Sequence, residues 1–375
     1  MKVTVTQQHL AHGLSIVSRA VSPRSTLPVL ANVLLATDEG RLRLSATNLE
    51  LGITCWIPAH IDEEGSITLP ARTFVDLVGT FPPDNVVMSL DERTQTINLV
   101  CNASIHDIKG IDAQDFPPMP VVDPEEGIEL NLADFKDMIQ QVAFAASTDE
   151  ARPVLQGVKM DVVDNVITLA ATDGFRISVR KEALSSPVSQ DISIIIPARA
   201  MNELARIFSD VDKAVRMIVP SGRGQVIFRL KDAELVSQLI DGNFPDYKAI
   251  IPKSAKTKTI ISTPAFLKAC KQAEVIAREG NNIIRLDILP GEDGPGKVEI
   301  NSQTEETGKS DISVEANIEG SGLLIAFNVR FLREVLDVIH SPNVALETNA
   351  NNSPGVIRPM GDEDFVHVIM PMHLG

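Results

Sequence analysis

The chain has 375 residues, of which 44% are hydrophobic and 22% are charged, and its formal net charge is −16. This length and composition are typical of a soluble protein with two or three globular domains, and no apolar run approaches the roughly 20 residues of a membrane-spanning helix. The acidic balance argues against nucleic-acid binding through a broad basic surface, and a single Trp and a single Tyr argue against a base-stacking platform.

The first predicted elements are a strand and a helix. The opening MKVTVTQQHL lacks the apolar stretch of a signal peptide, so we expect the protein in the cytoplasm. KVTV predicts a strand, and Thr6 can cap a helix that carries Leu10, Leu14, Val17 and Val21 on one side. Three strands should follow in NVLLAT, RLRLSAT and LELGITCWI, because apolar and polar residues alternate between Asp, Glu and Gly turns.

The same motif then occurs again. SITLPA predicts a strand that leads directly into a helix with Phe74, Leu77, Val78 and Phe81 facing inward. NVVMSL, TINLV and SIHDI predict three further strands. The first third of the chain therefore contains a strand-helix-strand-strand-strand motif twice.

The whole chain is predicted to consist of three copies of this pair of motifs. Pro28 in TLPVLANVLL precedes Pro153 in ARPVLQGVKM by 125 residues, and Arg72 in LPAR precedes Arg199 in IPAR by 127. Arg330 in FNVRFL follows Arg199 by 131 residues. Landmarks in one order at nearly one spacing indicate a repeated unit of about 125 residues.

The helices of the later copies should also bury one apolar stripe each. The stripe residues are Phe135, Met138, Ile139, Val142, Met201, Leu204, Ala205, Phe208, Phe266, Ala269, Cys270, Ala273, Leu332, Val335, Leu336 and Ile339. Such stripes, with one apolar face on most strands, predict an α+β fold in which helices cover one side of antiparallel sheets. PPMPVVDPEEG and IPKSAKTKT predict extended linkers at 117–127 and 251–259, so we expect domains at 1–121, 128–252 and 257–375.

Signals for an enzyme or a metal site are weak. GEDGPGKV has the spacing of part of a phosphate-binding loop, but Val298 follows the Lys and a strand continues, which favours a hairpin turn. AATDGFRI predicts a hairpin at Asp173 and Gly174 rather than a catalytic base. His9 and His12 lie near one helical face without a thiol or carboxylate to complete a metal set. We therefore expect no metal and no cofactor.

Two further features concern the cysteines and the C-terminus. Cys55, Cys101 and Cys270 are odd in number and far apart, which predicts buried thiols in a reducing compartment. The final FVHVIMPMHLG allows two interpretations. It is either only the last strand of the third copy or also one wall of a partner site, because Met side chains adapt to several peptides.

Several segments together resemble one family, the bacterial DNA polymerase III beta subunit, which is the replicative sliding clamp. They are TLPVLANVLL, PAR after a strand, ARPVLQGV, AATDGFRIS, IPAR, LIDGNFPDYKAIIP, AFNVRFLREVL and VIMPMHL, in family order across nearly the whole chain. The resemblance implies a DNA clamp fold of three repeated domains, each with two strand-helix-strand-strand-strand motifs, with helices inside and antiparallel sheets outside.

The resemblance also implies a function without catalysis. Two copies would close head to tail into a homodimeric ring around duplex DNA of any sequence. The ring would tether the DNA polymerase III core, the clamp loader and other proteins with clamp-binding motifs, and so confer processivity in replication. No membrane partner is expected.

An acidic chain suits such a clamp, because a ring that slides needs few phosphate contacts. The resemblance implies the DNA-binding residues Arg24, Arg72, Arg152, Arg199, Arg206 and Lys248. Position on a helix face adds Lys136, Lys271, Arg278 and Arg330 as weaker candidates. Each of these could equally be a solvated surface charge, and Asp134, Asp137 and Glu203 on the same helices should dilute the positive field.

A second implied site is an apolar pocket between the second and third domains that takes short peptide motifs. The matching residues are Leu155, Thr172, Gly174, Phe175, Arg176, Ile177, Pro245, Val368, Met370, Pro371, Met372 and Leu374, with Asn328 and Phe331 at its border. Phe175 stands where many members of the family have His, which changes the polarity of the pocket. Gly375 follows the usual terminal Leu.

Two alternatives stay open at this point. An acidic hydrolase or transferase would need a convergent polar pocket, which no motif of the sequence indicates. A site-specific duplex binder would need an exposed basic recognition helix, a sequence preference and a steep dependence of affinity on salt.

Overall fold

The structure is a computed structural model that describes residues 1–23, 25–123, 126–188, 190–208, 213–292, 294–304 and 308–373. The chain forms two compact units. Unit 1 comprises Met1–Ala133 and Glu203–Leu239, and unit 2 comprises Asp134–Asn202 and Ile240–Gly375. Among the described residues, no helix is both long enough and apolar enough to cross a membrane.

The first copy contains the predicted motif twice, with one additional strand. Its elements are β1 (Lys2–Thr6), α1 (Gln7–Val17), η1 (Ser18–Ala20), η2 (Pro28–Ala31), β2 (Asn32–Asp38), β3 (Arg41–Thr47), β4 (Leu51–Pro58), β5 (His60–Glu63), β6 (Ser66–Pro70), α2 (Ala71–Thr80), β7 (Asn85–Asp91), β8 (Thr96–Cys101), β9 (Ser104–Lys109) and η3 (Ala113–Asp115). The strand that the sequence did not predict is β5, a sheet-edge strand whose HIDE sequence has no apolar alternation.

The later copies repeat the same order. The second comprises β10 (Ile128–Asn131), α3 (Leu132–Val142), η4 (Ala143–Ala145), η5 (Pro153–Gln156), β11 (Gly157–Val163), β12 (Val166–Thr172), β13 (Arg176–Ala183), β14 (Ile192–Pro197), α4 (Ala198–Ile207), β15 (Ala214–Ile218), β16 (Gln225–Arg229), β17 (Ala233–Gln238) and η6 (Tyr247–Ala249). The third comprises β18 (Thr257–Ser262), α5 (Thr263–Ala277), β19 (Ile283–Leu289), β20 (Gly296–Thr304), β21 (Gly308–Gly320), β22 (Leu323–Asn328), α6 (Val329–Asp337), β23 (Asn343–Thr348), β24 (Gly355–Pro359) and β25 (Phe365–Ile369).

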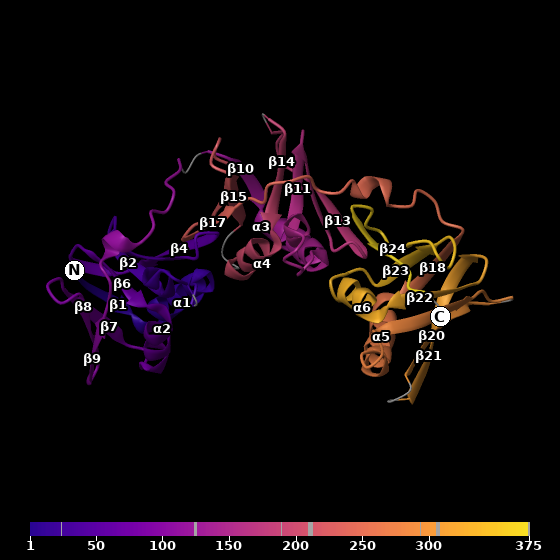
Figure 1. The fold of residues 1–375 in the computed structure, drawn as a ribbon, viewed down its shortest axis with the longest axis horizontal. Helices are drawn as coiled ribbons and strands as arrows, with labels where there is room; N and C mark the ends of the chain where they lie inside the picture. Colours follow the sequence, from indigo (N-terminus) through magenta and orange to yellow (C-terminus); the bar gives the residue numbers. More distant parts are fainter. Residues whose placement is uncertain are drawn as a thin grey trace. The chain divides into compact units, whose positions relative to one another are not determined.

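All strand pairs within the sheets are antiparallel, as predicted. Unit 1 holds a sheet in the order β5-β1-β7-β8-β9 and a second in the order β10-β15-β16-β17-β4-β3-β2-β6. Unit 2 holds one sheet in the order β14-β11-β12-β13-β25-β24-β23-β18-β21-β20-β19-β22. Figure 1 shows α1 beside α2 in unit 1 and α5 beside α6 in unit 2. The last strand of one copy therefore extends a sheet of the preceding copy twice, where β17 pairs with β4 and where β25 pairs with β13.

The first helix begins as predicted and ends sooner. The Thr6 hydroxyl accepts a hydrogen bond from the His9 N–H at 3.3 Å, which caps α1. Leu10, Leu14 and Val17 are buried on one side of the helix. Val21, also predicted on this stripe, lies beyond the helix in extended backbone after the η1 turn.

The strands β2 to β4 are buried on both faces, so the predicted alternation of apolar and polar residues is wrong there. Helix α1 covers one face so closely that a Cβ on Gly13 would lie 2.7 Å from Leu44 Cδ1. The segment after η3 covers the other face, where Phe116 packs against Leu34 and a Cβ on Gly52 would lie 2.5 Å from Met119 Cε. Strands covered twice become almost continuously apolar.

The remaining stripe predictions agree with the structure, with small shifts at the ends of elements. Buried Phe81, Phe208 and Ile339 lie one or two residues beyond the helices to which they were assigned. Residues 257–259, predicted as linker, begin β18, which pairs with β21 and β23 on its two sides. The GEDGPGKV segment joins β19 to β20 as a hairpin connection, as predicted, although its residue 293 lies outside the described residues.

Candidate partner and DNA-binding surfaces

The connection between β12 and β13 is a tight turn that Asp173 organises. Its carboxylate accepts hydrogen bonds from the backbone N–H groups of Phe175 at 2.9 Å and Arg176 at 3.1 Å. Gly174 has a φ of 93°, a backbone conformation that glycine adopts without strain. Thr172 closes the turn, because its hydroxyl donates to the Arg176 carbonyl at 2.7 Å and accepts from the Gly174 N–H at 3.0 Å. Asp173 is therefore a turn residue, as the sequence predicts.

Arg176 is buried and joins three elements of unit 2. Its guanidinium donates to Asp173 at 3.1 Å, to Glu334 of α6 at 2.5 Å and to the Phe144 carbonyl of η4 at 2.9 Å. The guanidinium carbon also lies 4.4 Å from the centre of the Phe331 ring. Burial alone would raise the pKa of Glu334, but hydrogen bonds from Arg330 and Arg176 lower it, so this carboxylate stays ionised. Arg176 thus links the β12–β13 turn to α6 through Asp173 and Glu334.

His367 lies next to this network, in β25. Its side chain is fully buried, its Nδ1 lies 2.6 Å from the Ser178 hydroxyl of β13, and its ring stacks on Phe144 at 5.5 Å. Burial, and then the charge of Arg176, lower the pKa of His367 well below its ordinary value of 6.5. The imidazole is therefore neutral in the folded protein.

This burial predicts a loss of stability in mild acid. The unfolded chain takes up a proton on this imidazole near pH 6.5 and the folded chain does not, so the free energy of unfolding should fall as the pH drops below that value, at up to about 1.4 kcal/mol per pH unit. Urea titrations between pH 7.5 and pH 5 should give a flatter profile for His367→Gln than for the parent. His60→Gln, at a side chain that is 78% exposed, should leave the profile unchanged. Equal profiles for the parent and His367→Gln would contradict this assignment.

The structure brings the predicted pocket residues together around the β12–β13 turn and the end of β25. Ile177 and Val368 are buried and pair across the two strands, and Tyr247 belongs to the same apolar cluster. Phe175 is 57% exposed and Met370 is 39% exposed, and the Met370 N–H donates to the Phe175 carbonyl at 2.8 Å. These five side chains form an apolar floor with an exposed apolar rim.

The other predicted pocket residues differ in their exposure. Leu155, Pro371 and Met372 are half-buried, and the Met372 N–H donates to the Ala326 carbonyl at 2.8 Å. Gly174 and Pro245 are exposed, whereas Thr172 and Arg176 are buried with their polar groups already bonded within the protein. Leu374 lies outside the described residues. Tyr247, the only Tyr of the chain, was not among the predicted pocket residues, although it lies in the quoted FPDY segment.

Most predicted DNA-binding cations are exposed, and several already have an acidic partner. Arg72 on α2 is 96% exposed and 3.9 Å from Asp76. On α4, Arg199 is exposed, and Arg206 is paired with Glu203 at 2.8 Å. Glu203 also pairs with Arg19 at 3.2 Å, an exposed cation that was not among the predicted DNA-binding residues.

The remaining candidates differ in their surroundings. Arg152 is bonded to Asp149 at 3.0 Å. The weaker candidates Lys271, Arg278 and Arg330 pair with Asp337, Glu279 and Glu334, and Lys136 is half-buried. Arg24 lies outside the described residues. Lys248 is exposed on η6, which packs against the opposite face of the unit 2 sheet from η4.

The chemistry of the cysteines is that of buried thiols. Cys55, Cys101 and Cys270 are all buried and free. Burial, and then the Asp232 carboxylate, raise the pKa of Cys55 to about 12, and burial also raises the pKa of Cys101 and Cys270. A thiol that stays protonated is neither a good nucleophile nor a good metal ligand. Within the described part of the chain, no three His, Cys, Asp or Glu side chains are grouped to hold a metal ion.

Comparison with known proteins agrees with this architecture along the whole chain. Family models of the DNA polymerase III beta subunit match residues 1–120 as the N-terminal domain, 129–246 as the central domain and 248–373 as the C-terminal domain. The beta sliding clamp of Synechococcus elongatus is 33% identical over 377 residues, which cover 100% of both chains. That of Staphylococcus epidermidis is 32% identical over 382 residues, which cover 99% of both.

Solved structures give the same result for the fold. The DNA polymerase sliding clamp of Bacillus subtilis superimposes with a TM-score of 0.93 at 30% identity, over 100% of both chains. That of Pseudomonas aeruginosa gives 0.89 at 26% identity, again over 100% of both. The three-domain fold is therefore that of a sliding clamp, a non-enzymatic processivity factor of DNA replication. The chain belongs to the DNA polymerase III beta subunit family.

Proposed function

We propose that two copies of this chain close head to tail into a ring around duplex DNA in the cytoplasm. The ring tethers the DNA polymerase III core, the clamp loader and other proteins that carry clamp-binding motifs. The three domains of each copy are residues 1–121, 128–252 and 257–375. Processivity then follows from encirclement, because a polymerase bound to a closed ring cannot diffuse away from its template.

The observation that carries this proposal is the recurrence of one strand pairing. The last strand of the second copy, β17, pairs with β4, and the last strand of the third, β25, pairs with β13. The last strand of the first copy, β9, ends its sheet. The strand that corresponds to β4 and β13 in the third copy is β21. Its residues 316–320 pair with β18. Its residues 308–315 pair with β20 and with no other strand in the described part of the chain.

A second chain can pair with both of these unpaired strands, β9 and residues 308–315 of β21, at the same time. If β9 of each chain pairs with residues 308–315 of the other chain, the two chains are joined by the same strand pairing that joins successive repeats within one chain. A head-to-tail contact of this kind must close to avoid fibres, and two such contacts close a ring. The exposed Ile105 of β9, with 69% of its surface accessible, would be covered by this contact.

The DNA-binding residues of the ring are proposed to be Arg24, Arg72, Arg152, Arg199 and Arg206. Carboxylate partners such as Asp76 and Glu203 weaken each cation, so contacts to phosphate should be loose, independent of sequence and easily broken by salt. Lys248 is left out of this set because of its place on the opposite face of the sheet. Partner peptides are proposed to bind on the floor of Ile177 and Val368, between the exposed side chains of Phe175 and Met370.

Retention on circular DNA tests encirclement directly. After loading by a bacterial clamp loader, the protein should stay on nicked circular DNA during gel filtration and leave once that DNA is cut. Blocking both ends of the cut DNA with a bound protein should restore retention, because a ring that encircles DNA can leave it only over a free end. Equal retention on circular and open linear DNA would contradict encirclement.

Ile105→Asp should prevent dimerisation and retention together, because it places a charge in the proposed contact between β9 and the other chain.

A further inference from the structure

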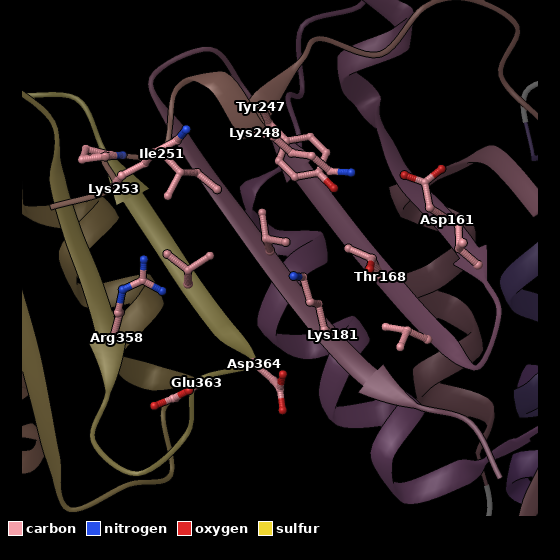
Figure 2. A pocket seen from close by; sticks show the side chains of 15 residues that line it. Asp161, Thr168, Lys181, Tyr247, Lys248, Ile251, Lys253, Arg358, Glu363 and Asp364 are labelled. Carbon is pink, nitrogen blue, oxygen red and sulfur yellow. The ribbon is translucent and has the colours of Figure 1, made fainter.

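A second surface of unit 2 lies beside the segment that leads out of the second copy. We call residues 244–253 the connector; it contains η6. Between the connector and the sheet runs a groove of about 810 Å³, which is within the range of about 300–1,000 Å³ typical of ligand pockets. This connector groove is lined from β11, β12, β13, β24 and β25 as well as from the connector itself. Figure 2 shows Lys181 and Thr168 on neighbouring strands and Lys248, Ile251 and Lys253 on the connector side.

The groove lies on the sheet face opposite η4. Side chains of a strand point alternately to the two faces of its sheet. Ser178 and His367 point toward Phe144 of η4, as their hydrogen bond and ring stacking show. Their neighbours Val179 and Val366 therefore point to the other face, where they line the groove. The groove is thus separate from the buried arginine network.

Its floor is apolar and partly open. Val163 is 48% exposed and Val166 is 38% exposed, at the end of the β11–β12 hairpin. Val179 and Val366 continue this surface across β13 and β25, and Ile251 faces it from the connector. Together the five side chains form an apolar strip under a cavity large enough for several side chains of a ligand.

The groove differs in charge from the rest of the molecule. The whole chain has 34 Lys and Arg against 50 Asp and Glu, whereas the lining residues include four cations and three anions. Within the described residues, no ion pair includes Lys181, Lys248 or Lys253. The fourth cation, Arg358, is paired with Glu347 at 3.3 Å, and of the three anions Asp161 is already bonded to Lys159 and Ser193. The other two, Glu363 and Asp364, come from the turn before β25, at the opposite end of the groove from Lys248 in Figure 2.

Tyr247 supplies a buried polar group without a partner. Only 5% of this residue is exposed, and among the described residues its hydroxyl has no hydrogen-bond partner. Buried Tyr hydroxyls normally have one. Burial, and then the charges of Asp161 and Asp246, raise the pKa of Tyr247 to about 12, so the group is an O–H that can donate. Because Tyr247 lines the groove, a carbonyl or carboxylate oxygen of a ligand there could accept this hydrogen bond.

We infer that the connector groove binds an extended segment of a partner protein in which acidic side chains alternate with apolar ones. In an extended segment, alternate side chains point to opposite sides. The apolar ones would rest on Val166, Val179 and Val366, and the acidic ones would face Lys181 and Lys248. The groove adjoins the pocket at Phe175 and Met370 and shares Tyr247 with its floor. The inference goes beyond the proposed function, since it concerns side chains further along β11, β12, β13 and β25, and it holds whether or not that pocket binds peptides.

A methyl NMR titration of the full-length protein tests it. The probe is the capped peptide Glu-Leu-Asp-Val-Glu-Leu, and the control is Lys-Leu-Lys-Val-Lys-Leu. We expect the acidic peptide to shift the methyl signals of Val166, Val179 and Val366, and the basic peptide to leave them unchanged. A short DNA duplex serves as a third probe, because unpaired lysines also attract phosphate. Shifts with the duplex and none with the acidic peptide would overturn the inference.

Two variants separate charge from the hydroxyl group. Lys181→Glu combined with Lys248→Glu should weaken the acidic peptide at least about tenfold. The matched control Lys231→Glu with Lys268→Glu changes the net charge equally, at two exposed lysines outside the groove, and should have little effect. Tyr247→Phe keeps the ring in its cluster and should weaken binding about threefold to tenfold. Unchanged affinity in both the Lys181/Lys248 and the Tyr247 variants would also overturn the inference.

Discussion

Replacing Arg176 by alanine is expected to lower the free energy of unfolding by about 3–5 kcal/mol, because it removes one partner from a buried ion pair. The guanidinium is the only group in the described structure that bonds to Asp173, Glu334 and the Phe144 carbonyl together. Without it, two carboxylates and a carbonyl lose a charged donor in a poorly hydrated place. Arg176→Lys should restore only part of the loss, since an ammonium group cannot reproduce the planar fork.

A matched control is available on the same carboxylate. Arg330 also donates to Glu334, at 2.8 Å, but its side chain is 61% exposed. Arg330→Ala should therefore cost less than about 1 kcal/mol, as exposed pairs do. Equal losses for the Arg176 and Arg330 variants would show that burial is not the reason for the effect.

The measurement can separate the two units. Hydrogen exchange in β13 and β25 measures the urea unfolding of unit 2. Fluorescence of Trp56, the single Trp, measures the unfolding of unit 1. We expect the first signal to change and the second to stay as in the parent. The difference between parent and Arg176→Ala should also shrink in acid. The folded pKa of Glu334 is lowered, so its stabilising contribution is present above its ordinary value of 4.5 and is lost as the pH falls through the folded value.

Removing residues 371–375 is expected to abolish stimulation of the polymerase without opening the ring. The deletion takes away Pro371 and Met372 from the rim of the proposed peptide pocket and leaves Met370 with its bond to the Phe175 carbonyl. In the described part of the tail it removes one sheet hydrogen bond, from Met372 to Ala326, which should cost only about 1 kcal/mol. The strands proposed to close the ring, β9 and β21, are untouched.

Primer extension on a circular template measures this effect, and gel filtration with light scattering measures the ring. Phe175→Ala is a useful companion, because it leaves the tail intact and removes the exposed aromatic side chain of the rim. It should reduce stimulation partially and leave the dimer unchanged. Full stimulation by the truncated protein, with the dimer preserved, would show that the peptide pocket has been assigned to the wrong place.

Much of the fold could be predicted because the chain repeats itself. Arg72 and Arg199 mark the same strand-to-helix junction in two copies, and the structure places α2 and α4 directly after β6 and β14. The errors arose where burial came from a remote segment. The alternation predicted for β2 to β4 failed because Phe116 and Met119 cover the face that was expected to be polar. The sequence of a strand does not show that a remote segment will bury its second face.

The candidate sites divide in the same way. The turn at Asp173 and Gly174 could be predicted from its own residues, since its hydrogen bonds are made within a few positions of the chain. The bond between Ser178 and His367 joins residues 189 positions apart, so their burial could not be predicted from sequence spacing. The connector groove had no sequence signal either, because its lysines come from a strand and from a separate turn.

The sequence by itself therefore determined the repeated strand-helix units, the caps and turns, and, through family resemblance, the class of protein. These depend on local periodicity and on short-range hydrogen bonds. Only the tertiary structure decided which strands meet, which cations keep an acidic partner, and that the buried Arg176 bonds to Asp173, Glu334 and the Phe144 carbonyl. Those properties depend on contacts between segments far apart in the chain, where packing and desolvation act on whichever side chains the fold brings together.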